Sequence, residues 1–124
     1  MEIIPFGAKD IDNILQKEPN RAEFLPFGAI LLDRNGVILK YNAAEGLIVG
    51  RSASDTMAKN FFNDVAPCAK GKRMHSEFLR FARSGQINVM LDYEFDYKMK
   101  ATRVRIHMKS TPDGQQCWMF IKRL

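Results

Sequence analysis

The sequence has few cysteines and no long apolar run. Its 124 residues include only Cys68 and Cys117, which are too few for a disulfide framework and match no paired zinc-ligand spacing. No segment approaches the roughly 20 apolar residues of a membrane span, and the acidic start Met-Glu-Ile-Ile lacks the basic region of a secretory signal. These absences predict a reduced, cytoplasmic protein of a single domain with no membrane association.

Positive charge is in modest excess, and its distribution argues against a nucleic-acid partner. The formal net charge is +5, with basic residues gathered at 70–73, 103–109 and 122–123. The aromatic residues lie within apolar alternation rather than among these basic residues, so they offer no stacking platform for bases. We expect a monomer with a solvated basic face or a docking surface for an acidic protein.

Residues 1–25 are predicted to form a cap on the rest of the chain. Asp10 is placed to begin a short helix in which Ile11, Ile14 and Leu15 share one face, and the following proline ends it. The segment carries too few apolar side chains to fold alone. It must therefore pack against a core that comprises residues 26–124.

The first half of this core is predicted to contain a hairpin followed by helices. Residues 28–33 and 37–41 are apolar strands joined by Asn35-Gly36, a strong hairpin signal because both residues tolerate positive φ angles. Short helical turns follow. A longer amphipathic helix is predicted over 72–84, and Gly85 is its stop signal.

The second half is predicted to form three strands. Apolar residues occupy every second position over 88–99 and again over 103–109, which is the period of a strand with one buried face. The last strand, 117–121, is apolar on both faces, so both faces of the sheet must be covered, with the cap over Trp118 and Phe120. The predicted fold is α+β, a five-stranded antiparallel sheet with helices on one face and a helical cap on the other, as in PAS sensor domains.

The segment Asn60-Phe-Phe-Asn-Asp-Val-Ala-Pro-Cys68 is the most informative in the chain. It places a cysteine directly after two aromatic residues, a turn and a proline. A cysteine held in an apolar pocket can act as a nucleophile or as a covalent anchor, in both cases through its thiolate. The alternative is that Cys68 is a small buried hydrophobic residue.

This segment closely resembles the photoactive yellow proteins, as do Tyr41-Asn-Ala-Ala-Glu45-Gly and the closing Trp-Met-Phe-Ile-Lys-Arg. The resemblance extends over the whole chain. It implies a blue-light receptor, not an enzyme, whose cysteine carries p-coumaric acid (4-hydroxycinnamic acid) as a thioester. Position by position, Cys68 matches the attachment site, Tyr41 and Glu45 match the hydrogen-bond donors to the chromophore's phenolate, and Arg51 matches the group that shields its ring. The pocket wall that the resemblance implies consists of Ile30, Phe61, Val65, Phe95, Tyr97, Met99 and Ile121.

The implied photochemistry needs a tyrosine and a glutamate that converge on one oxygen. A phenolate in an apolar pocket requires hydrogen-bond donors, and burial favours the protonated, donating form of Glu45. After trans-to-cis isomerisation, Glu45 is expected to give its proton to the phenolate, and the buried carboxylate that remains releases the cap. A downstream signalling protein would then bind the exposed surface. Val49 stands where better-known members have a threonine that supports Tyr41, so we expect a shifted or split absorption band.

Two other functions are compatible with parts of the sequence. A Cys–His enzyme would need a histidine beside Cys68, but His75 is expected on a helix surface and His107 on the polar face of a strand. A PAS interaction or ligand-binding module would have the same fold without a covalent chromophore, or with a flavin or haem. A colourless holoprotein would favour this second alternative.

Overall fold

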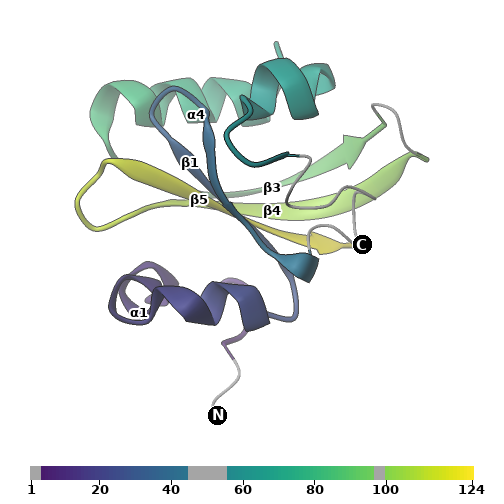
Figure 1. Ribbon diagram of the computed structural model, residues 1–124. Coiled ribbons are helices and arrows are strands. Elements are labelled where there is room, and N and C mark those ends of the chain that lie inside the picture. The colour runs from purple at the N-terminus through teal and green to yellow at the C-terminus, as the bar shows by residue number, and fades with distance from the viewer. Residues whose placement is uncertain (1–3, 45–55, 97–99) are drawn as a thin grey trace.

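The computed structural model describes residues 4–44, 56–96 and 100–124. Five strands form one antiparallel sheet in the order β2-β1-β5-β4-β3. Their bounds are β1 Gly28–Asp33, β2 Ile38–Tyr41, β3 Asn88–Phe95, β4 Thr102–Ser110 and β5 Gln116–Arg123. Helix α4 (Arg73–Ser84) lies over one face of this sheet and helix α1 (Ile11–Lys17) over the other, as Figure 1 shows. The predicted layer order is confirmed.

The first hairpin is closed by the side chain of Asp33. The hairpin predicted from Asn35-Gly36 is confirmed, and within this pair Gly36 alone has a positive φ angle, of 87°. The Asp33 carboxylate accepts hydrogen bonds from the backbone N–H groups of Asn35 and Val37, at 2.8 and 2.9 Å. An Asx-type turn thus closes the hairpin.

Helix α4 covers the upper face of the sheet with the apolar stripe that the sequence predicted. Met74, Phe78 and Phe81 are buried, and Gly85 ends the helix in the left-handed conformation at φ 77°. A side chain at this glycine would meet the backbone of Gly114, whose carbonyl oxygen lies 3.2 Å from the position of a Cβ. Both the turn and the close approach therefore require glycine here.

Short helices precede α4 within the described residues. They include η2 (Phe61–Val65), which has π-type hydrogen bonding, and η3 (Pro67–Ala69), a single 3-10 turn. Over the parts of the chain that the structure describes, every helix is too short or too polar to cross a membrane.

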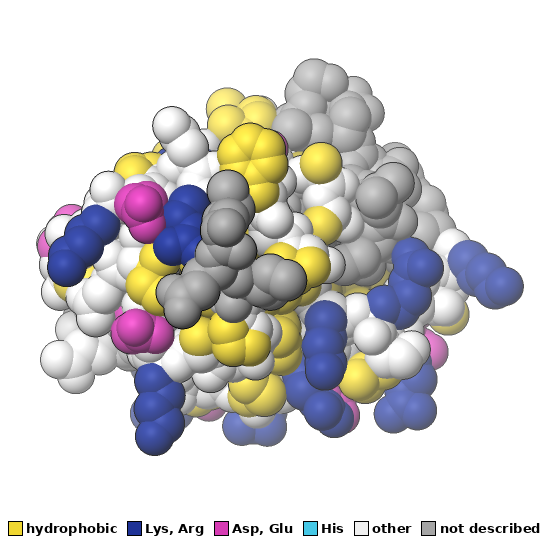
Figure 2. Space-filling model, turned by 90° about the horizontal axis from the view of Figure 1, so that it is seen from below, with side chains coloured by type: hydrophobic (Ala, Val, Ile, Leu, Met, Phe, Trp, Pro, Cys, Tyr) yellow, Lys and Arg dark blue, Asp and Glu magenta, His cyan; other side chains and the backbone are white. Residues whose placement is uncertain are grey.

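The N-terminal segment packs on the lower face of the sheet, as predicted. Helix α1 and the 3-10 helix η1 (Pro19–Phe24) form a second apolar cluster with strands β1 and β5. The buried members of this lower cluster are Ile4, Ile11, Leu15, Ala22, Leu25, Phe27, Ala29, Leu31, Trp118 and Phe120. Asp10 precedes α1 but makes no side-chain capping bond. Figure 2, which views the molecule from this side, shows hydrophobic side chains with lysine and arginine side chains near them and acidic side chains among these.

Polar contacts fasten the cap to the sheet. The Lys109 ammonium on β4 lies 2.8 Å from the Asp12 carboxylate on α1 and also donates to the backbone carbonyl of Lys9. The Asn42 amide donates to the carbonyls of Ala22 and Phe27, at 2.9 and 3.0 Å. The cap is thus fixed by buried polar groups as well as by apolar packing.

Candidate functional site

The aromatic and cysteine-bearing segment is anchored at its start by Asn60. The side-chain oxygen of Asn60 accepts from the N–H of Phe62 at 3.0 Å, while its amide donates to the carbonyl of Asn35 in the first hairpin at 2.7 Å. The Asp64 carboxylate accepts in return from the N–H of Asn60, at 3.0 Å. This reciprocal cap fixes η2 against the β1–β2 turn and so sets the direction in which the chain runs toward Cys68.

Cys68 lies in η3 as a partly buried free thiol, and its sulfur has a tyrosine partner. The Tyr93 hydroxyl on β3 donates to Sγ across 3.3 Å, and its ring packs edge-on against Phe95 with centroids 5.0 Å apart. Burial, and to a smaller extent this hydrogen bond, raises the pKa of Tyr93 well above its usual range. The hydroxyl therefore keeps its proton and remains a donor. The sequence reasoning did not identify Tyr93 as a site residue. Strand alternation predicted that it faces inward, without indicating which group its hydroxyl reaches.

Six of the predicted pocket residues belong to one buried cluster beneath α4. They are Ile30, Tyr41, Phe61, Val65, Phe95 and Ile121, each no more than 8 % exposed. Cys68 packs against this cluster, and we call the six residues together with Cys68 the inner site. Strand register pairs Ile30 with Tyr41, while the Phe61 ring meets Phe95 edge-on at 6.4 Å. The fold thus brings together residues that lie far apart in the sequence.

Five predicted site residues fall outside the described parts of the chain. They are Glu45, Val49, Arg51, Tyr97 and Met99. Their roles remain predictions from the resemblance. Of the predicted strand over 88–99, β3 covers Asn88–Phe95 and residue 96 is irregular, whereas residues 97–99 lie outside the described parts of the chain.

The two histidines contact partners other than the cysteine sulfur. The His75 ring is half-buried and packs on Phe62 with centroids 4.6 Å apart. His107 is 5 % exposed beneath the cap, where its Nε2 lies 2.8 Å from the Asn88 side-chain oxygen. The expectation that His107 lies on a polar face is therefore wrong, because the cap covers β4 at this point. Among the described residues, no histidine is hydrogen-bonded to Cys68 as a Cys–His enzyme would require.

Comparisons with known proteins agree with this geometry. A family model described as the PAS fold matches residues 9–123. The photoactive yellow protein of Cereibacter sphaeroides is 66% identical over 124 residues, which is 100% of both chains. That of Rhodobacter capsulatus is 67% identical over 123 residues, which is 99% of both chains. The chain belongs to the photoactive yellow protein family.

Solved structures place the family within the wider PAS fold. The photoactive yellow protein domain of a sensor histidine kinase from Rhodospirillum centenum has a TM-score of 0.76 at 33% identity, covering 82% of this chain and 95% of that domain. A PAS domain of an HTR-like protein from Haloarcula marismortui has a TM-score of 0.66 at 11% identity, covering 92% and 100%, and shares the fold alone. The chain is thus a PAS photoreceptor of the photoactive yellow protein family.

The inner site combines a free thiol with apolar and aromatic walls. Cys68 offers a free thiol at the edge of an apolar cluster, and two phenylalanine rings with two isoleucines supply walls against which an aromatic group can pack. Tyr41, 3 % exposed, brings a phenolic hydroxyl into the same cluster. The other cysteine, Cys117, is fully buried, and burial raises its pKa far above the usual range. Of the two thiols, Cys68 is the more exposed.

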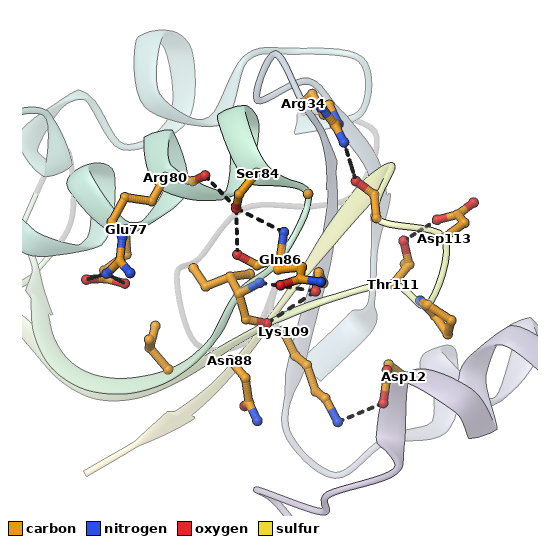
Figure 3. A pocket seen from close by; sticks show the side chains of 16 residues that line it. Asp12, Arg34, Glu77, Arg80, Ser84, Gln86, Asn88, Lys109, Thr111 and Asp113 are labelled. Atoms are coloured by element: carbon orange, nitrogen blue, oxygen red, sulfur yellow. Dashed lines mark hydrogen bonds and ion pairs between the residues drawn. The ribbon is translucent and has the colours of Figure 1, made fainter.

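A separate open hollow of about 690 Å³ lies beside the C-terminal end of α4. Figure 3 shows Lys109 and Asp12 pointing toward each other at its edge, and Arg34 reaching the carbonyl of Gly114 at 3.0 Å. The inner-site residues do not line it. Asp12 is the cap residue among those that line the hollow, and most of the others come from α4, β3, β4 and the turn before β5.

Proposed function

We propose that the chain is a blue-light receptor that carries p-coumaric acid as a thioester on Cys68. The observation that carries this proposal is the inner site itself, a free thiol packed against a buried aromatic cluster with a phenolic side chain. Relatives named photoactive yellow proteins, at 66% and 67% identity over nearly all of the chain, support the same assignment. The bound group would supply light absorption and isomerisation of its double bond.

The protein's own residues would hold the chromophore's phenolate and control its proton. In an apolar site, desolvation disfavours a phenolate unless donors are aimed at its oxygen. The Tyr41 hydroxyl supplies one donor, and a protonated Glu45 supplies the other. When the phenolate oxygen moves away from these donors, the Glu45 proton passes to it and a carboxylate is left behind. Arg51, Val49, Tyr97 and Met99 would complete the surroundings.

The signal would be release of the cap. A buried carboxylate without a partner costs several kcal/mol, against a total stability of about 5–15 kcal/mol for a domain of this kind. This is enough to open the least stable layer. The cap is that layer in our proposal, because it is built from short helices and from polar contacts such as Asp12 to Lys109. Release would uncover Trp118 and Phe120, which are 3 % and 0 % exposed beneath it.

A downstream protein with an acidic surface is the partner that we propose. The sequence carries a net charge of +5, and Figure 2 shows basic side chains around the hydrophobic ones on the cap side. Such a partner would gain charge complementarity at the rim and apolar contact at the centre. Thermal return of the chromophore would close the surface again.

The visible absorption spectrum tests the proposal. Purified protein is incubated with an activated 4-hydroxycinnamoyl anhydride and measured in darkness, under blue light, and again in darkness. We expect a visible band that bleaches in light and recovers, and that is absent from Cys68→Ala because the thioester cannot form. Cys117→Ala is the matched control, since it removes the other thiol of the same buried cluster and should keep the band.

The result that would overturn the proposal is a correctly folded wild-type protein that forms no visible band. A band of equal strength in Cys68→Ala would likewise exclude the thioester. Either outcome would make a PAS ligand-binding or interaction module without covalent chromophore the leading account.

A further inference from the structure

Tyr93 makes a contact with the attachment cysteine that pocket packing alone does not require. Its ring already packs against Phe95 at 5.0 Å, which would satisfy an apolar wall position. Its hydroxyl is directed at Sγ of Cys68, 3.3 Å away. In the described parts of the chain, the Cys68 sulfur makes this one hydrogen bond.

We propose that Tyr93 is a positioning residue for acylation of Cys68, holding Sγ at the edge of the inner site and stabilising the negative charge that develops on it. The inference rests on the proposed function and extends it to the step by which the chromophore is attached. A hydroxyl that donates to a thiol makes a weak hydrogen bond, and the same hydroxyl that donates to a thiolate makes a stronger, charge-assisted one. The contact therefore favours the reactive form of the cysteine.

Tyr93 donates a hydrogen bond during the attachment step and is not consumed in it. The Sγ–H bond breaks and its proton passes to water. The Sγ–C bond forms at the carbonyl of an activated hydroxycinnamoyl ester or anhydride, whose leaving group departs with the bonding electron pair. Tyr93 keeps its own proton throughout, in agreement with the raised pKa of its hydroxyl. Once Sγ is a neutral thioester sulfur, the strong form of the contact is lost.

Alkylation of the chromophore-free protein tests this inference without any photochemistry. The rate at which iodoacetamide modifies Cys68 is measured from pH 6 to pH 10, with the modified peptide identified by mass spectrometry. In this reaction the S–C bond forms, iodide leaves and the thiol proton goes to solvent, so the rate follows the thiolate fraction. Tyr93→Phe keeps the ring and its packing against Phe95 but removes the donor.

We expect the pH of half-maximal rate to rise by about half a unit in Tyr93→Phe, which is about a threefold slower reaction at neutral pH. The plateau rate at high pH should stay close to that of the wild type. A change in access to the thiol would alter the plateau without moving the midpoint. Tyr93→Leu, which also removes the ring, should show the same displacement of the midpoint together with an altered plateau.

A Tyr93→Phe profile that coincides with the wild-type profile, or that moves to lower pH, would overturn the inference. A displacement seen only in Tyr93→Leu would also overturn it, because ring packing and not the hydroxyl would then control the sulfur. The outcome is separable from the proposed function. A protein that never forms a visible band can still show the displacement, and a photoactive protein can fail to show it.

Discussion

The two faces of the sheet are covered by layers of different construction. Over the described residues, the upper cluster beneath α4 contains twenty-one buried residues and the lower cluster beneath the cap contains ten. The upper layer includes a helix of twelve residues, whereas the cap offers one of seven and a short 3-10 helix. Of the four buried polar residues in the described parts of the chain, Asp12, Asn42 and His107 belong to the lower side, and the fourth is Thr56.

This difference assigns separate tasks to the two layers. Apolar burial stabilises in proportion to area and needs no exact partner, so the upper layer can hold a rigid pocket. Polar contacts at the cap stabilise only while each partner is in place, and a buried group that loses its partner becomes costly. The lower layer is therefore the one that a local change can open.

A matched pair of truncations tests whether the layers open separately. Phe81→Ala removes a fully buried ring from the upper cluster and is expected to lower the free energy of unfolding by about 3–5 kcal/mol, as for large core truncations in general. Leu15→Ala removes a side chain that is 2 % exposed in the lower cluster. The lost packing, about 2–5 kcal/mol, should lower the free energy of opening the cap and leave the upper layer unaffected.

Chemical denaturation and amide hydrogen exchange separate these outcomes. In Phe81→Ala the denaturation midpoint should fall for the whole domain. In Leu15→Ala the amides of α1 and η1 should exchange faster while those of α4 keep their protection. Equal loss of protection in α4 in both variants would mean that the two layers unfold as one unit.

A smaller effect is expected from the ion pair that links cap and sheet. Lys109 and Asp12 are 14 and 11 % exposed as side chains, so Asp12→Asn leaves a largely buried ammonium without its counter-charge. We expect the free energy of opening the cap, measured by amide exchange in α1, to fall by about 1–3 kcal/mol. Asp92→Asn is the matched control. It breaks the pair of Asp92 with Arg105 on the same strand as Lys109, but both side chains are at least 40 % exposed there.

The control variant should behave like the wild type, because solvent screens an exposed pair. If Asp12→Asn also leaves exchange in α1 unchanged, the ion pair does not hold the cap and apolar packing alone does. If Asp92→Asn loosens α1 as much as Asp12→Asn does, the effect reflects overall charge and not this contact.

The sheet and its upper layer were predictable from the sequence, because their side chains follow simple periods. Leu91 and Phe95 alternate with exposed residues along β3, and Met74, Phe78 and Phe81 recur at helical spacing in α4. Burial of both faces of β5 followed from its unbroken apolar run. The five described wall residues of the inner site and Tyr41 came from the resemblance, and the fold gathers them in one cluster.

The side-chain contacts that depend on tertiary placement were not predictable. His107 follows Arg103 and Arg105 at every second position, so alternation assigned it to the solvent. Burial of His107 depends on how far the cap extends over β4, which no local pattern encodes. The hydroxyl of Tyr93 meets Cys68 for a similar reason, since the contact joins a strand to a 3-10 turn that lies 25 residues earlier.

His107 offers the most subtle test of the difference between the layers, through pH. Burial lowers the pKa of His107, the nearby Lys109 ammonium lowers it further, and the Asp12 carboxylate opposes both. The other groups around the ring are the side-chain oxygen of Asn88, which lies next to Nε2, and the rings of Phe6 and Phe120. Neutral His107 therefore suits the folded cap better than the charged form does.

The sign of the pH effect follows from this depressed pKa. Above the unfolded value of about 6.5, His107 is neutral in both states and the cap keeps its full stability. As the pH falls through that value toward the lower folded one, the unfolded state binds the proton first, and stability is lost. We therefore expect amide protection in α1 to decline between pH 7.5 and pH 5. Protection in α4, on the other face of the sheet, should decline less.

His107→Gln is the variant that isolates this contribution, since glutamine keeps a hydrogen-bonding group near Asn88 but does not titrate. Its α1 protection should be nearly constant over the same pH range. An identical decline in wild type and variant would assign the pH dependence to other groups. A rise in wild-type protection toward pH 5 would mean that attraction between Asp12 and a charged imidazole outweighs burial, and the lower layer would then be held more tightly by charge than its construction suggests.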